Sequence, residues 1–172
     1  MCSIGGIVRE CLGHCDEVIV VDDGSTDETY RVSLEAGATV IRNETNIGVV
    51  RATAIGLKHA LGEVVVTLDG DGQHDPSEIP TLVAPIVNNQ ADLALGARRT
   101  RPMSERFLAV IVGESVDVGT GFRAIRRSYA NKIDLHGFCL CGIIQLEARR
   151  LGARVVEAPI HLRPRTHGKG HV

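Results

Sequence analysis

Two carboxylates and an amide stand on alternate residues after the apolar run 63–68, at Asp69, Asp71 and Gln73. Carboxylates gathered this closely repel one another unless a cation joins them. Their oxygen atoms suit Mg²⁺ or Mn²⁺, and such ions keep coordination positions open for the phosphates of a substrate. The alternative is a plain polar turn, but two intervening glycines and a paired acid are a poor way to build one. We therefore expect a divalent metal at these three side chains.

A second acidic pair, Asp22 and Asp23, closes the apolar run 17–22. A carboxylate at this point can accept hydrogen bonds from a base or a ribose. The alternative is helix capping, and the spacing of Ser25 and Glu28 is that of a capping box. Because Ser25 accounts for the cap, the two preceding acids are left for a nucleoside. Asp75, followed by a proline, is better explained as the cap of the next helix than as a ligand.

Two arginines stand at positions that favour the binding of an anion. Arg51 falls in the first turn of a helix that begins at Gly48, and helix N-termini favour anions. Arg98 comes just after the predicted strand 91–96, and a guanidinium there suits a phosphate. Acids and cations together predict a site for a phosphorylated ligand.

The elements that must position these residues alternate along the chain. We predict helices at 4–12, 25–37, 48–61, 75–89, 104–112 and 143–151, and strands at 17–22, 38–41, 63–68, 91–96, 122–125 and 154–157. This alternation predicts an α/β fold, with a mostly parallel sheet and helices on both faces. Ligands of such sheets bind beyond the carboxyl ends of the strands, which is where both acidic pairs fall.

The bulk composition narrows the class of protein. With 172 residues, the chain is expected to form a single domain spanning 1–172. A net charge of −2 argues against nucleic-acid binding. No apolar run reaches the length of a membrane span, and no signal peptide is recognisable, which favours the cytoplasm. The five cysteines are irregularly spaced and are expected to be free thiols, not zinc ligands.

Taken in order, the motifs resemble the family 2 glycosyltransferases, in particular the dolichyl-phosphate mannosyltransferase and polyprenyl-phosphate sugar transferase branch. The residues that carry the resemblance are Val21–Asp27, Asn46-x-Gly48, Leu68–Pro76, Gly96-x-Arg98, Asp117-x-x-x-Gly121-Phe122-Arg123, Glu157-x-Pro159-Ile160 and Arg165-x-x-Gly168-Lys169. Together they cover almost the whole chain.

The resemblance implies a GT-A fold and an inverting sugar transfer that needs Mg²⁺ or Mn²⁺. The donor would be a nucleoside-diphosphate sugar of mannose or glucose, with GDP-mannose suggested by the closest resemblance. The acceptor would be a polyprenyl or dolichyl phosphate at the membrane surface, or another molecule. The implied roles are metal ligands at Asp69, Asp71 and Gln73; donor binding at Asp22, Asp23, Gly48, Arg51, Asp69, Arg165 and Lys169; and catalysis by Asp71, Asp117, Arg98 and Arg123. Asp23 matches the nucleoside-binding acid.

One departure from the family bears on the fold. The family normally begins with a central strand that ends in Pro-x-x-Asn-Glu, whereas Met1 here leads almost directly into the first predicted helix. The strands at 17–22 and 63–68 would then pair directly, or another chain would cover the gap between them. We therefore expect a marginally stable or homo-oligomeric chain.

Two other functions remain open. The first is an inactive module of GT-A ancestry that binds nucleotides or partners, since fold does not guarantee function. The second is a phosphatase of the haloacid-dehalogenase type, with Asp69 as nucleophile and Asp71 as acid. That motif has Thr or Val at the position of Gln73, and it usually lies near the N-terminus.

Overall fold

The computed structural model describes residues 4–98, 120–135 and 142–163. The helix expected at 104–112 lies outside these ranges, as do three of the predicted site residues, Asp117, Arg165 and Lys169.

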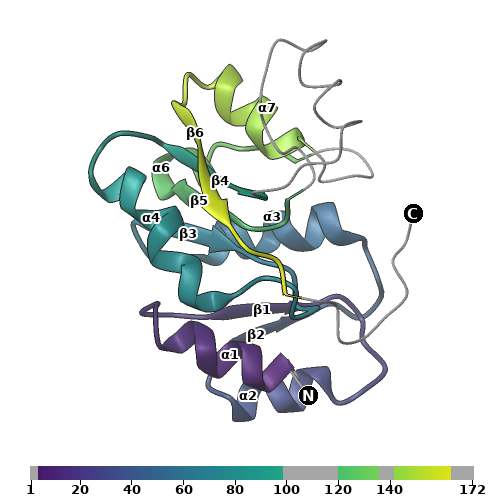
Figure 1. Cartoon of the computed structure of the whole chain (residues 1–172). Coiled ribbons are helices and arrows are strands. Elements are labelled where there is room, and N and C mark those ends of the chain that lie inside the picture. Colours follow the sequence, from purple (N-terminus) through teal and green to yellow (C-terminus); the bar gives the residue numbers. More distant parts are fainter. Residues whose placement is uncertain (1–3, 99–119, 136–141, 164–172) are drawn as a thin grey trace.

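Helices and strands alternate as the sequence predicts (Figure 1). The helices are α1 (Ile4–Leu12), α2 (Thr29–Glu35), α3 (Val49–His59), the 3₁₀ helix η1 (Pro76–Glu78), α4 (Ile79–Val87), α6 (Arg127–Ala130) and α7 (Ile143–Arg150). The strands are β1 (Ile19–Asp22), β2 (Thr39–Arg42), β3 (Val64–Thr67), β4 (Leu93–Arg98), β5 (Arg123–Arg126) and β6 (Val155–Ile160). The short helix α6 was not predicted.

The described strands form two sheets. β1 and β2 make a parallel pair, and the other four strands are ordered β3-β5-β4-β6. Strand β5 runs antiparallel to both β3 and β4, whereas β4 and β6 are parallel. Strands β3, β4 and β6 therefore share one direction, as expected for a mostly parallel sheet, but β5 lies between β3 and β4 and makes this sheet mixed within the described chain.

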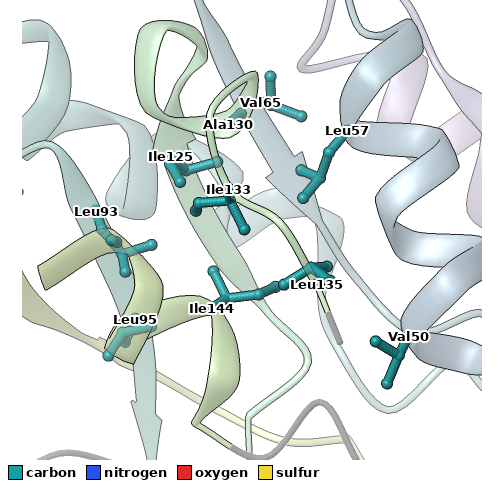
Figure 2. Close-up of a cluster of buried hydrophobic side chains, with 11 residues drawn as sticks. Val50, Leu57, Val65, Leu93, Leu95, Ile125, Ala130, Ile133, Leu135 and Ile144 are labelled. Atoms are coloured by element: carbon teal, nitrogen blue, oxygen red, sulfur yellow. The ribbon is translucent and has the colours of Figure 1, made fainter. Parts of the chain in front are cut away.

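Helices cover both faces of the four-stranded sheet. Because side chains alternate along a strand, Leu93 and Leu95 of β4 face one core while Ala94 faces the other. The first core, drawn in Figure 2, joins the sheet to α3 and α7 through Val50, Leu57 and Ile144 among others. The second core joins the sheet to α1 and α4. Its helical members are Ile7, Cys11, Ile79, Leu82 and Ile86.

Helices α1 and α3 connect the two sheets. Ile7 of α1 belongs to the core beneath the four-stranded sheet, and Val8 packs with the apolar side chains of β1 and β2. On the opposite face, α3 supplies Leu57 to the first core, and its Gly56 lies against Val21 of β1. Within the described residues, β1 pairs only with β2, and β3 pairs only with β5. The direct pairing of β1 with β3 that we considered does not occur in this part of the chain.

The predicted capping box at Ser25 is wrong. Helix α2 begins at Thr29, and its N-cap Glu28 makes no capping hydrogen bond through its side chain. The Ser25 N–H instead donates to Asp22 Oδ1 at 2.9 Å, which fixes a turn immediately after β1. The Thr29 N–H donates to Asp27 Oδ1 at 3.0 Å, so Asp27, one residue before the N-cap, satisfies the first N–H of the helix. The residues in which the helix was expected to start belong instead to the turn after β1.

The predicted cap at Asp75 is confirmed. Its Oδ1 accepts the Ser77 N–H at 2.9 Å and the Ser77 hydroxyl at 2.7 Å. Pro76 is the first residue of η1, where its missing N–H costs nothing.

Candidate functional site

Asp22, the last residue of β1, is a buried acid with one oxygen that no hydrogen bond satisfies. The residue is 2% exposed, and its Oδ1 accepts the Ser25 N–H. Its Oδ2 has no hydrogen-bond partner in the described part of the chain and lies 3.6 Å from Nε of Arg42. An unsatisfied buried acceptor is costly, so this atom is well suited to a donor group of a ligand.

The neighbouring acid, Asp23, is fully engaged by the protein. Its Oδ1 accepts hydrogen bonds from the Asn43 amide at 2.8 Å and the Ile47 N–H at 3.0 Å, and its Oδ2 accepts the Gly48 N–H at 2.8 Å. Burial alone would raise the pKa of Asp23, but these hydrogen bonds outweigh it and lower the pKa. Asp23 therefore anchors the loop 43–48, and Asp22 is the better placed of the two acids for a nucleoside.

Two glycines allow this loop to close over the end of β1. Gly24 has φ +77°, and a Cβ there would lie 2.8 Å from the backbone nitrogen of Asn46. Gly48 has φ +93° and is the N-cap residue of α3. Arg51 is exposed in the first turn of that helix, as predicted from the sequence.

Sequence reasoning missed Arg42, the last residue of β2. Its guanidinium lies over the ring of Tyr30, 5.2 Å from the centroid, and donates to the Ser25 carbonyl at 3.2 Å. Arg42 is also the cation beside Asp22 Oδ2. The register of β1 with β2 places Asp22 opposite Arg42. Arg42 could have been predicted to lie beside Asp22, because the two residues end adjacent parallel strands.

The predicted metal ligands follow β3 as expected. Asp69 is exposed, and its carboxylate has no hydrogen-bond or ion-pair partner within the described chain. Asp71 is half-buried, and its Oδ1 accepts the Gln73 N–H at 3.0 Å, which curls the loop.

The donor set fits a hard divalent cation. Within the described ranges, no three side chains of His, Cys, Asp or Glu converge as a metal cluster would require. A cation bound after β3 would be held by the carboxylates of Asp69 and Asp71 and the amide of Gln73. Mg²⁺ and Mn²⁺ commonly bind through one or two carboxylates and complete their shell with water and substrate phosphates. The three side chains suit such a shared site and not a closed structural one.

The loop after β3 that carries Asp69, Asp71 and Asp75, called the acidic loop below, is bound to the segment that follows β6. The Arg163 N–H donates to the Gln73 carbonyl at 2.7 Å, and the Arg163 guanidinium pairs with Asp75 at 2.7 Å and with Glu10 of α1 at 3.1 Å. Just past Gln73, His74 is buried with its ring centroid 5.2 Å from that of Phe122. These long-range contacts leave no local sequence signal.

The remaining predicted residues are placed less fully. Arg123, the first residue of β5, is 4% exposed and lies opposite Thr67 of β3. Arg98 is the last residue of β4, with its backbone opposite Ile160. Cys11 and Cys15 are free thiols, as predicted, and burial raises the pKa of Cys11 to about 11. No helix in the described ranges combines the length and apolar character needed to cross a bilayer.

Comparison with known proteins identifies the family. The pattern of Glycosyl transferase family 2 matches residues 9–143. The chain is 36% identical over 120 residues to a UDP-N-acetylglucosamine–dolichyl-phosphate N-acetylglucosaminyltransferase of Methanococcus voltae, covering 58% of this chain and 48% of that one. It is 29% identical over 175 residues to a dolichol-phosphate mannosyltransferase of Pyrococcus furiosus, covering 89% and 49%. The chain thus spans about half the length of these two transferases.

The fold agrees with that family. The crystal structure of glucosyl-3-phosphoglycerate synthase from Mycobacterium tuberculosis with Mn²⁺ and UDP-glucose superimposes with a TM-score of 0.79, at 21% identity, over 97% of this chain and 67% of that one. The chain therefore has a GT-A fold, belongs to glycosyl transferase family 2, and is similar to its dolichyl-phosphate mannosyltransferase and polyprenyl-phosphate sugar transferase members.

Proposed function

We propose that this chain transfers a sugar from a nucleoside-diphosphate sugar to a lipid phosphate, with the help of Mg²⁺ or Mn²⁺. The observation that carries the proposal is the exposed carboxylate of Asp69, which has no partner among the described residues, with Asp71 and Gln73 following at alternate positions. The names of the relatives support the substrate classes, since one is a dolichol-phosphate mannosyltransferase and another uses UDP-N-acetylglucosamine and dolichyl phosphate.

In the proposed reaction, the bond between the anomeric carbon and the diphosphate oxygen breaks, and the electron pair leaves with the nucleoside diphosphate. The acceptor oxygen forms the new bond from the opposite face, which inverts the anomeric carbon. A metal held by Asp69, Asp71 and Gln73 would neutralise charge on the departing diphosphate. A lipid phosphate is already an anion and needs no base. A hydroxyl acceptor would lose its proton to a carboxylate, for which Asp117 is our candidate.

The nucleoside end of the donor is assigned to the end of β1. Asp22 Oδ2 would accept a hydrogen bond from an N–H of the base or an O–H of the ribose, because it is buried and unsatisfied. Asp23 and Gly48 would act by holding the loop 43–48 in place. Five cations are proposed for the phosphates and the acceptor: Arg51, Arg98, Arg123, Arg165 and Lys169.

We place the reaction in the cytoplasm, with the protein peripheral to the membrane where a polyprenyl phosphate is presented. The relatives' names favour a lipid-phosphate acceptor, and they span more than one sugar. GDP-mannose, UDP-glucose and UDP-N-acetylglucosamine are therefore the donors to try first.

The test is a turnover assay with these three donors, a short-chain polyprenyl phosphate and Mn²⁺. Release of the nucleoside diphosphate and the mass of the lipid product are measured for wild type and for Asp71→Asn, with Asp27→Asn, on the exposed turn before α2, as the matched control. We expect one donor to give a sugar-lipid product that Asp71→Asn abolishes and Asp27→Asn does not.

Two other results would overturn the proposal. Binding of a nucleotide without turnover of any donor would indicate an inactive module. Release of phosphate from p-nitrophenyl phosphate, without sugar transfer, would indicate a phosphatase.

A further inference from the structure

We propose that Gly121 is a positioning residue for Asp69, whose carboxylate lies directly against the Gly121 Cα, where any side chain would begin. This inference rests on the proposed role of Asp69 as a metal ligand. It concerns a residue of the loop before β5, far in sequence from the acidic loop that it supports.

The contact is too close for any other residue. A Cβ on Gly121 would lie 2.2 Å from Oδ2, 2.5 Å from Cγ and 2.6 Å from Oδ1 of Asp69. These three atoms are the nearest heavy atoms that such a Cβ would meet, so the carboxyl group is the closest obstacle to a side chain at this position. Atoms at such distances repel strongly, and one of the two residues must move.

The backbone of Gly121 does not require glycine. Its φ is not in the left-handed region, unlike those of Gly24 and Gly48. A left-handed backbone therefore does not exclude alanine from this position. The absence of a side chain at this position is explained by the neighbouring carboxylate and not by the turn.

The backbone of Gly121 is held firmly against β3. The Thr67 hydroxyl donates to the Gly121 carbonyl at 3.0 Å, and Thr67 itself lies opposite Arg123 in the β3–β5 ladder. On the other side, the Phe122 N–H donates to the Thr120 hydroxyl at 3.2 Å. With the backbone fixed on both sides, the group that yields to a new methyl is the Asp69 carboxylate.

The carboxylate of Asp69 can yield cheaply because it is exposed and has no partner in the described chain. A rotation about its side-chain bonds costs little stability but points its oxygens away from their original place. Changing a residue that orients a metal ligand typically lowers metal affinity by about 10–100-fold. Gly121→Ala is therefore expected to separate metal binding from folding.

The experiment is a titration of Mn²⁺ followed by electron paramagnetic resonance, in the presence of saturating GDP or UDP. It compares wild type, Gly121→Ala, Asp69→Ala and the double variant, and a urea melt without metal is recorded for each. Gly56→Ala is the matched control, because its Cβ also meets one side chain, Val21 Cγ2 at 3.3 Å, but lies on α3 away from the acidic loop.

We expect Gly121→Ala to lower Mn²⁺ affinity by about 10–100-fold with a urea midpoint close to that of wild type. Gly56→Ala should bind Mn²⁺ as wild type does. In the Asp69→Ala background, Gly121→Ala should have no further effect on Mn²⁺ affinity, because the group that it displaces is gone.

The inference is overturned if Gly121→Ala binds Mn²⁺ like wild type, if it does not fold, or if its effect persists without Asp69. If wild type itself binds no Mn²⁺ in the presence of either nucleotide, the proposed function fails instead. The two failures are therefore distinguishable.

Discussion

At the scale of single residues, Asp22 and Asp23 show how adjacent acids acquire different tasks. Asp23 accepts three hydrogen bonds from the loop 43–48, whereas Asp22 Oδ2 is buried and accepts none from the residues that the structure describes. The sequence predicted an acidic pair at a strand end but could not divide the roles. That division depends on a loop that returns more than twenty residues later, with the Ile47 and Gly48 N–H groups turned toward Asp23.

We predict opposite effects for substitutions of these two acids. Asp23→Ala should lower the free energy of unfolding by about 2 kcal/mol, because it removes charge-assisted hydrogen bonds from a partly buried loop. Asp22→Asn should retain most of the stability, since its amide oxygen still accepts the Ser25 N–H, but should weaken nucleotide binding. Urea melts and calorimetric titration with GDP or UDP measure the two quantities. Stable Asp23→Ala protein together with unfolded Asp22→Asn protein would refute this assignment.

Residues that act through distant contacts could not be predicted from local patterns. Asp69, Asp71 and Asp75 were found from their spacing after a strand and before a proline. Arg163, which fastens the acidic loop, and Gly121, which lies under Asp69, are separated from their partners by tens of residues. Ser25 was misassigned because the turn after β1 uses its N–H before a helix can start.

At the scale of elements, most strand and helix positions followed from the alternation of apolar runs. The direction of β5 could not be predicted in this way, because the sequence of a four-residue strand does not indicate whether it runs parallel or antiparallel to its neighbours. An ion-pair cluster beside Asp92 holds this strand in place. The Asp92 carboxylate pairs with Arg154, at the start of β6, at 2.9 Å, and with Arg126 of β5 at 3.2 Å. The cluster joins the starts of β4 and β6 to the end of β5.

This cluster predicts a pH dependence of stability. Hydrogen bonds from Arg154, aided by those from Arg126, outweigh burial and lower the pKa of Asp92 to about 2. A carboxyl group with a depressed folded pKa stabilises the protein above its unfolded pKa of about 4, and this contribution is lost as pH falls through the folded value. The contribution is at most about 2 kcal/mol, since both arginines are partly exposed to solvent.

The comparison of wild type with Asp92→Asn measures it. The difference in free energy of unfolding should be largest near neutral pH and should shrink between about pH 4 and pH 2. Asp16→Asn, which changes an exposed acid before β1, is the control. A difference that stays constant across this range would show that the charge of Asp92 is not what stabilises the cluster.

At the scale of the whole molecule, the described strands form two separate sheets and not one. Helices α1 and α3 pack against both sheets from opposite faces, yet β1 and β3 lie in different sheets within the described chain (Figure 1). Each of these strands therefore has one edge that no described strand pairs. Unpaired edges of buried strands are costly and favour association with another chain.

We predict that an added strand stabilises the protein. Fusing a strand-forming segment that ends in Pro-x-x-Asn-Glu before Met1 should raise both Tm and the affinity for a nucleoside diphosphate. The same segment with its sequence scrambled is the control. Without the fusion, light scattering should detect a homo-oligomer or a melt of low midpoint. A stable monomer that gains nothing from the fused segment would contradict this prediction.

The most direct test of the central claim is calorimetry of GDP and UDP binding, in Mn²⁺ and in EDTA, for wild type and Asp71→Asn. One nucleotide should bind wild type more tightly in Mn²⁺, and at a hundredfold excess over its Kd should stabilise the protein by about 2.7 kcal/mol. Asp71→Asn should lose most of the metal-dependent part. If wild type binds GDP as tightly in EDTA as in Mn²⁺, and UDP likewise, the result would contradict a metal site at Asp69, Asp71 and Gln73.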